Sequence, residues 1–166
     1  MKLNSTDIVV ILDRSGSMEH IANDMRGGFD TFIREQKKIP GECHVTLTQF
    51  DDHFDVVYLR KPLLHVSKLN LTPRGYTALL DAIGKTINET GERLSTLPES
   101  ERPSRVLVVI ITDGQENASK EFSRQQVFDM IKHQREVYKW DFVFLGADQD
   151  AISVGTDIGI LAINSV

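Results

Sequence analysis

The chain has 166 residues, a length that suits a single domain, and we expect residues 1–166 to form one domain. Its composition, 40% hydrophobic and 26% charged, is typical of a globular protein with a substantial core. The net charge of −5 gives no reason to expect nucleic acid or an anionic membrane surface as a partner.

Cys43 is the single cysteine, which excludes an internal disulfide and a cysteine-based metal cluster. No apolar run approaches the ~20 residues of a membrane span, and the first residues contain no apolar signal region. We therefore expect a cytoplasmic location and no membrane partner.

The first predicted strand covers residues 8–12, a continuous apolar run rich in β-branched residues. Such a run is typical of a strand buried on both faces, as in a parallel sheet. Apolar side chains then recur at helical spacing and predict an amphipathic helix: Met18, Ile21, Ala22, Met25, Phe29, Phe32 and Ile33. Gly27 and Gly28 interrupt this helix, and we expect them to allow close packing against the sheet.

Residues 43–50 and 54–59 are the next two predicted strands, joined by the short link at Asp51 and Asp52. A link this short can join only antiparallel neighbours, because a parallel crossover needs about a dozen residues or more. We therefore interpret the link as a hairpin turn, not as a pair of metal ligands. Residues 54–59 then form an antiparallel edge strand.

The following segment is irregular until a second helix, which Pro98 ends. The buried face of this helix is predicted to carry Leu80, Ile83, Ile87 and Leu94. Residues 106–111 are the most apolar run in the chain and predict a central strand.

Ser123 and Gln126 resemble a capping box that begins a third helix. The positions that this helix should bury are Val127, Ile131, Gln134 and Tyr138. Residues 142–145 predict the last clear strand, and residues 151–155 a short helical segment. Residues 158–163 could be a further edge strand or the start of a helix. This alternation of elements predicts an open α/β sheet with helices on both faces.

Oxygen-bearing side chains follow the two most apolar strands. In an open parallel sheet, ligands bind outside the carboxyl ends of the strands, where the strand order reverses. Asp13 and Asp113 both lie at such strand ends and would face one crevice if their strands flank the reversal. Ser15 and Ser17 lie on the loop after Asp13, and Thr77 precedes the second helix.

Two carboxylates and three hydroxyls form an all-oxygen donor set. Such donors suit Mg²⁺, Mn²⁺ or Ca²⁺ and not zinc, which prefers nitrogen and sulfur. With only two carboxylates, the cation would keep Lewis acidity and room for an outside oxygen. An Asp or Glu side chain from a partner protein could fill that position.

Three pieces of the sequence resemble, in order and spacing, the metal-ion-dependent adhesion site of von Willebrand factor A domains: Asp13-x-Ser15-x-Ser17, Thr77 and Asp113-Gly114. The resemblance covers about residues 7–163. It implies a Rossmann-like open, mostly parallel sheet with one antiparallel edge strand and helices on both faces. It also implies that the three hydroxyls coordinate a cation directly, Mg²⁺ above all, and that the two carboxylates do so directly or through water.

Each piece alone has a simpler interpretation. Asp13 could interact with a helix dipole, Ser15, Ser17 or Thr77 could cap a helix, and Asp113 with Gly114 could form a turn. The metal site rests on their combination. Five side chains around it are candidate contacts for a partner: Arg14, Arg74, Tyr76, Asn117 and Asp148. The two arginines could also be ordinary solvated side chains.

The leading hypothesis is therefore a divalent-cation-dependent protein-binding module and not an enzyme. An alternative is a Mg²⁺-dependent phosphoryl-transfer or phosphate-binding α/β domain. Phosphatases of the haloacid dehalogenase type need a second carboxylate two residues after the first, where this chain has Ser15, and no Gly-x-x-x-x-Gly-Lys loop occurs. A third hypothesis is a scaffold subunit of an ATPase-type assembly, in which the motif only stabilises the fold.

Overall fold

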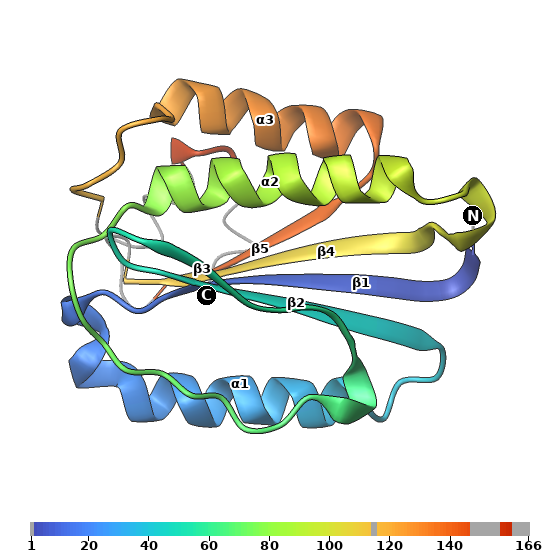
Figure 1. Cartoon of the computed structure of the whole chain (residues 1–166), viewed down its shortest axis with the longest axis horizontal. Helices are drawn as coiled ribbons and strands as arrows, with labels where there is room; N and C mark the ends of the chain where they lie inside the picture. The colour runs from blue at the N-terminus through green and yellow to red at the C-terminus, as the bar shows by residue number, and fades with distance from the viewer. Residues whose placement is uncertain (1, 114–115, 147–156, 161–166) are drawn as a thin grey trace.

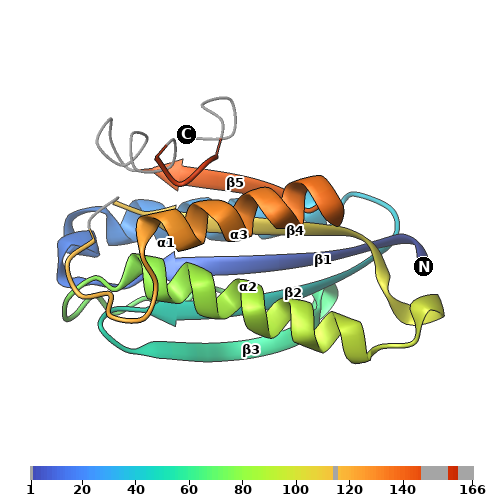
Figure 2. The same cartoon turned by 90° about the horizontal axis from the view of Figure 1, so that it is seen from above.

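A computed structural model of the chain describes residues 2–113, 116–146 and 157–160. In these residues the strands form one sheet in the order β3-β2-β1-β4-β5 (Figures 1 and 2). Their bounds are β1 (Lys2–Asp13), β2 (Glu42–Phe50), β3 (Phe54–Pro62), β4 (Pro103–Thr112) and β5 (Asp141–Gly146). The helices are α1 (Ala22–Gln36), α2 (Leu79–Thr96) and α3 (Arg124–Val137), with the short 3₁₀ helices η1 (Gly16–Ile21), η2 (Leu63–His65) and η3 (Glu99–Glu101).

The direction of the strands confirms the predicted mixed sheet. β1 pairs in parallel with β2 and β4, β4 pairs in parallel with β5, and β3 runs antiparallel to β2 at the edge. The short link at Asp51 and Asp52 is the turn of the β2–β3 hairpin, as predicted. From β1 the chain continues to β2 and β3 on one side of β1, and it then returns to form β4 and β5 on the other side. The strand order therefore reverses between β1 and β4.

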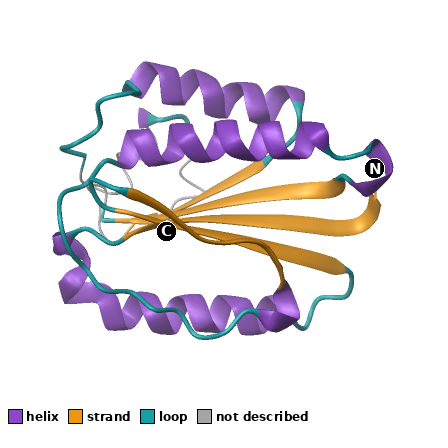
Figure 3. Ribbon diagram, viewed as in Figure 1, coloured by secondary structure: helices purple, strands orange, loops and turns teal. Residues whose placement is uncertain are grey.

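Helices cover both faces of the sheet, α1 on one face and α2 with α3 on the other (Figures 1 and 3). The residues of β1 alternate between two hydrophobic clusters because successive side chains of a strand point to opposite faces. Val9 and Ile11 pack under α2 and α3, whereas Val10 and Leu12 pack against α1. Burial on both faces explains why β1 has a continuous apolar sequence.

Two details of the predicted helices are wrong. Gly27 and Gly28 do not pack against the sheet, because both are exposed and a Cβ atom at either position would meet nothing within 4 Å. Tyr138 is 61% exposed, because α3 ends at Val137 and the chain turns through Lys139 with a φ angle of 60°. Trp140 is buried in the core cluster beyond that turn.

The end of the chain is described only in part. Ile158 and Ile160 are buried in the cluster under α2 and α3. The predicted helical segment at residues 151–155 lies outside the described residues. Within the described part of the chain, no helix combines the length and the apolar character needed to cross a membrane.

Candidate metal centre

Asp13 is the last residue of β1 and is fully buried at the point where the strand order reverses. Its Oδ1 atom accepts a hydrogen bond of 2.7 Å from the backbone N–H of Ser15. Its Oδ2 atom accepts one of 2.8 Å from the hydroxyl of Thr112, the last residue of β4. The carboxylate is therefore held between the ends of the two strands that flank the reversal.

Burial raises the pKa of Asp13 from 3.8 to about 6. The hydrogen bonds from Ser15 and Thr112 favour the charged form and limit this rise, while the negative charge of Asp113 adds to it. Asp113 directly follows β4 and is also buried. The two predicted carboxylates therefore lie close enough to repel each other, which is the environment that a cation would stabilise.

The loop after Asp13 brings two hydroxyl groups together. The Oγ atoms of Ser15 and Ser17 are 3.0 Å apart, with Ser15 buried and Ser17 half-buried. Two neighbouring ligands of an octahedral Mg²⁺ ion, each about 2.1 Å from the metal, lie about 3.0 Å from each other. The spacing and chemistry of these donors thus fit a small hard cation.

Thr77 is buried on the loop that precedes α2. Its backbone N–H donates to Oδ1 of Asn117 (2.9 Å), and its carbonyl accepts from the N–H groups of Asn117 (2.9 Å) and Ala118 (3.1 Å). The N–H of Gly16 donates to the carbonyl of Gly75 (3.1 Å), which links the Thr77 loop to the loop after β1. The structure thus brings the predicted ligands Asp13, Ser15, Ser17, Thr77 and Asp113 to the carboxyl ends of β1 and β4, on the left-hand side of Figure 2. That they bind a cation stays a prediction.

The segment 116–122, which follows β4, holds the first turn of α2. Glu116 and Ser119 accept hydrogen bonds of 3.0 Å from the backbone N–H groups of Leu80 and Asp81, respectively. In return, the carboxylate of Asp81 accepts from the N–H groups of three successive residues: Lys120, Glu121 and Phe122. The bonds from Leu80 and Asp81 satisfy donors that a helix start leaves without partners, and all five bonds fix the helix that Thr77 precedes. Local sequence gave no signal for this role of Glu116, because its bond partner Leu80 is 36 residues away.

The candidate partner contacts differ in exposure. Tyr76 is 69% exposed, and Asn117 is exposed beside Thr77. Arg14 is buried, in contrast to a solvated side chain, and its guanidinium binds Asp51 and Asp55. The side chain of Arg74 is more exposed, and its Nε lies 3.0 Å from Asp51 Oδ2. Asp148 lies outside the described residues.

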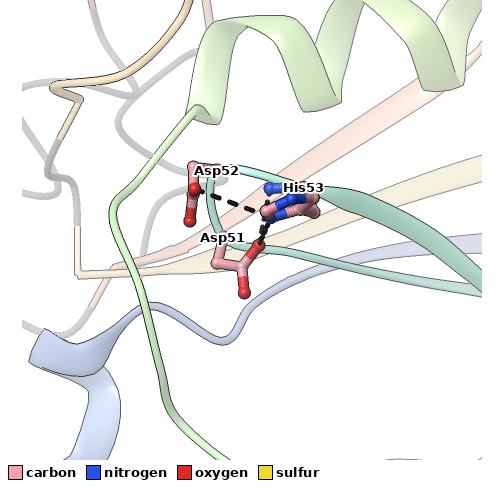
Figure 4. A group of neighbouring side chains, drawn as sticks. All are labelled: Asp51, Asp52 and His53. Carbon is pink, nitrogen blue, oxygen red and sulfur yellow. Dashed lines mark hydrogen bonds and ion pairs between the residues drawn. The ribbon is translucent and has the colours of Figure 1, made fainter.

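A second group of metal-ligand types lies at the hairpin turn, where Asp51, Asp52 and His53 bring one ligand atom each within 4.8 Å of one another (Figure 4). Both carboxylate oxygens of Asp51 are already engaged. Oδ1 accepts the backbone N–H of His53 (2.6 Å), and Oδ2 accepts from Arg14 (3.3 Å) and Arg74 (3.0 Å).

Burial alone would raise the pKa of Asp51, but the His53 N–H and the two guanidinium groups outweigh it and hold the pKa below its usual value. A divalent cation at the hairpin would lie beside the positive charges of two arginines, which bind the same carboxylate. The hairpin group therefore fits a metal less well than the Asp13 loop does. Local sequence gave no signal for these pairs, because Arg14 and Arg74 are 37 and 23 residues away from Asp51.

Residues 7–151 match the sequence model of the von Willebrand factor type A domain. A search of curated proteins gives no match. Similar solved structures include proximal thread matrix protein 1 of the mussel byssus, with 16% identity, a TM-score of 0.65, and coverage of 98% of this chain and 41% of that chain. The pilus adhesin SpaC of Lactobacillus rhamnosus GG has 16% identity, a TM-score of 0.68, and coverage of 99% of this chain and 28% of that chain.

Manganese-loaded TRAP protein of Plasmodium vivax has 13% identity, a TM-score of 0.62, and coverage of 94% of this chain and 64% of that chain. The chain spans less than two thirds of the length of each of these proteins. At such identities the likeness shows the fold alone, whereas the family model covers most of the chain. The chain therefore belongs to the von Willebrand factor type A domain family.

Proposed function

We propose that the chain is a divalent-cation-dependent protein-binding module, in which a carboxylate from a partner protein completes the coordination of the metal. The observation that carries this proposal is the donor set after β1. Buried Asp13 lies beside two hydroxyl groups whose oxygens are 3.0 Å apart, at the reversal of the strand order. Ser15, Ser17 and Thr77 would hold the cation with Asp13 and Asp113.

The charge of the donor set supports a role in binding rather than a closed structural cage. Two carboxylates balance the formal charge of a divalent cation without any excess, because the remaining donors are uncharged hydroxyls. A bound cation would therefore supply an electrophilic position for an outside oxygen, which an Asp or Glu side chain fills well. Mg²⁺ is the cation that we expect at this site. The cytoplasmic location of the chain also stays a prediction.

Von Willebrand factor A domains are generally interaction modules, which agrees with the proposal. One similar structure is that of a manganese-loaded protein, and another is that of a pilus adhesin. Because their sequence identity to this chain is low, the geometry of this chain carries the argument.

Calorimetric titration with Mg²⁺ and Mn²⁺ tests the site. We expect the wild-type chain to bind one cation and the double variant Asp13→Ala, Ser15→Ala to lose binding. The control is Asp52→Asn, which removes a charge from the hairpin group and should keep the affinity for the cation. Equal affinity in the wild type and the double variant would falsify the assignment of these ligands.

A second experiment tests the partner. A pull-down with the immobilised chain should retain a partner protein in Mg²⁺ and release it when EDTA is added. Retention of the same partner in EDTA would contradict coordination by a partner carboxylate, since the interface would then not need the metal.

A further inference from the structure

A groove of about 500 Å³ lies between the β2–β3 hairpin and α2, next to the candidate metal centre. Asp52 and Phe54 line it from the hairpin, and Lys85 and Glu89 line it from α2. Ala78 also lines the groove and directly follows Thr77 in the chain. Since consecutive Cα atoms are about 3.8 Å apart, the groove begins beside the candidate metal ligand.

The groove carries an excess of negative charge. Four carboxylates line it, against a single lysine: Asp52, Asp55, Asp81 and Glu89. Two of them have strong partners of their own, because Asp55 binds Arg14 and Asp81 accepts three backbone N–H groups. Asp52 accepts a hydrogen bond of 3.2 Å from the N–H of Tyr76, which does not neutralise its charge, and its Oδ2 lies 3.5 Å from Nδ1 of His53, an imidazole that is charged only when protonated. Glu89 is exposed on the helix wall.

An aromatic ring forms part of the apolar wall of the groove and already attracts a cation. The Nζ atom of Lys85 lies 5.9 Å from the centroid of the Phe54 ring, within the range of a cation–π interaction. The same ammonium group lies 3.4 Å from Glu121, which is not a lining residue. Lys85 therefore shares its charge with a carboxylate outside the groove.

These features suit the side chain of a basic residue. An apolar wall accommodates the aliphatic stem of Arg or Lys, an aromatic face attracts its charge, and carboxylates at the opening accept its N–H groups. Arginine fits best, because a guanidinium is planar and stacks on rings while it donates several hydrogen bonds.

We infer that the groove binds an arginine or lysine side chain of the same partner segment whose carboxylate completes the metal site. This inference rests on the proposed function. An extended segment advances about 3.3–3.6 Å per residue, so a basic residue a few positions from the metal-bound acid can reach the groove. The partner motif is thus an acidic residue followed or preceded at short distance by a basic one.

The experiment uses the ¹⁵N-labelled full chain and short synthetic peptides in Mg²⁺ and in EDTA. Each peptide has one aspartate, a spacer of one to three glycines in either direction, and either arginine or its uncharged isostere citrulline. We expect the arginine peptide of the right spacing to shift the amide resonances of Phe54, Lys85 and Glu89. It should bind about fivefold more tightly than its citrulline counterpart, the effect of a solvent-exposed ion pair.

Matched variants locate the effect. Asp52→Asn with Glu89→Gln should abolish the preference for arginine, whereas Glu92→Gln removes an exposed charge of α2 outside the lining residues and should keep it. Equal binding of arginine and citrulline peptides, or no shift in the groove with any peptide, would overturn the inference even if Mg²⁺ strengthens binding. If the arginine peptide binds with equal affinity in Mg²⁺ and in EDTA, and still more tightly than the citrulline peptide, the groove is a basic-side-chain site and the proposed metal-dependent function fails.

Discussion

The carboxylate of Asp13 lies where a negative charge is costly without a cation. Its pKa in the folded chain, about 6, is higher than its ordinary value of 3.8, so the folded state binds the proton more tightly than the unfolded state does. The stability of the metal-free chain should therefore fall as the pH rises from 3.8 to 6. The loss would be complete above pH 6 and amount to at most about 3 kcal/mol.

Replacement of Asp13 by Asn tests this balance. Asn keeps an oxygen to accept the Ser15 N–H, and its amide can donate to the Thr112 hydroxyl. In EDTA at pH 7, we expect the variant to be more stable than the wild type by up to about 3 kcal/mol, and to lack the fall in stability between pH 4 and 6. Urea unfolding across this pH range measures both, and a variant less stable than the wild type in EDTA would contradict the argument.

Cys43 should react slowly in the folded chain. Burial and the negative charge of Asp7 raise the pKa of its thiol from 9.0 to about 11. Because the thiolate is the nucleophile, its fraction at pH 8 falls about a hundredfold. Alkylation by iodoacetamide should therefore be about a hundredfold slower in buffer than in urea, as followed by mass spectrometry. Similar rates in both solvents would show that the thiol is solvated in the folded chain.

At the scale of elements, α2 is joined to the segment 116–122 by a close contact at a glycine. A Cβ atom on Gly84 would lie 2.5 Å from the ring of Phe122, much too close for a stable contact. Gly84→Ala should therefore lower the free energy of unfolding by about 1–3 kcal/mol through overpacking, even though alanine favours a helix.

The same helix offers a matched control for this prediction. Gly91 also lies in α2, but a Cβ atom there would meet nothing within 4 Å. Gly91→Ala should raise the free energy of unfolding by up to about 1 kcal/mol, because only helix propensity changes. Denaturant unfolding of both variants gives the comparison, and equal effects would mean that Phe122 moves aside without cost.

At the scale of the whole molecule, local sequence was enough for most of the fold. The continuous apolar run of residues 8–12 predicted a strand in a parallel sheet, and the short link at Asp51 and Asp52 predicted an antiparallel hairpin. Both signals depend on neighbouring residues alone, and together they predicted the mixed sheet. Asp13 and Asp113 could be placed at one edge because parallel strands bring their carboxyl ends together, whereas Thr77 was added by the family resemblance.

Features that depend on residues far apart in the sequence could not be predicted. The binding of Arg14 and Arg74 to Asp51 and the contact of Gly84 with Phe122 join segments that only the folded chain brings together. Helical spacing also wrongly predicted that Tyr138 is buried. Periodicity does not show where a helix ends, and α3 ends one residue earlier, at Val137. The sequence of segment 116–122 has no regular pattern, so it did not predict the hydrogen bonds between this segment and α2.

Binding of a cation to the folded chain alone should stabilise the whole domain. The free energy of unfolding should rise with the logarithm of the Mg²⁺ concentration and reach a gain of about 2.7 kcal/mol at a hundredfold excess over the dissociation constant. The dependence of unfolding on urea, the m value, should stay constant, because binding does not change the surface exposed on unfolding. Equal ionic strength of KCl controls for screening.

Two variants decide which group of residues holds the cation in this measurement. Asp13→Ala with Ser15→Ala should show no gain from Mg²⁺, because it removes a carboxylate and one of the two hydroxyls that lie 3.0 Å apart. Asp52→Asn should keep the full gain, because the arginines already engage the neighbouring Asp51 and leave the hairpin a poor cation site. If Asp52→Asn removes the gain and the double variant keeps it, the cation binds at the hairpin and not at the loop after β1.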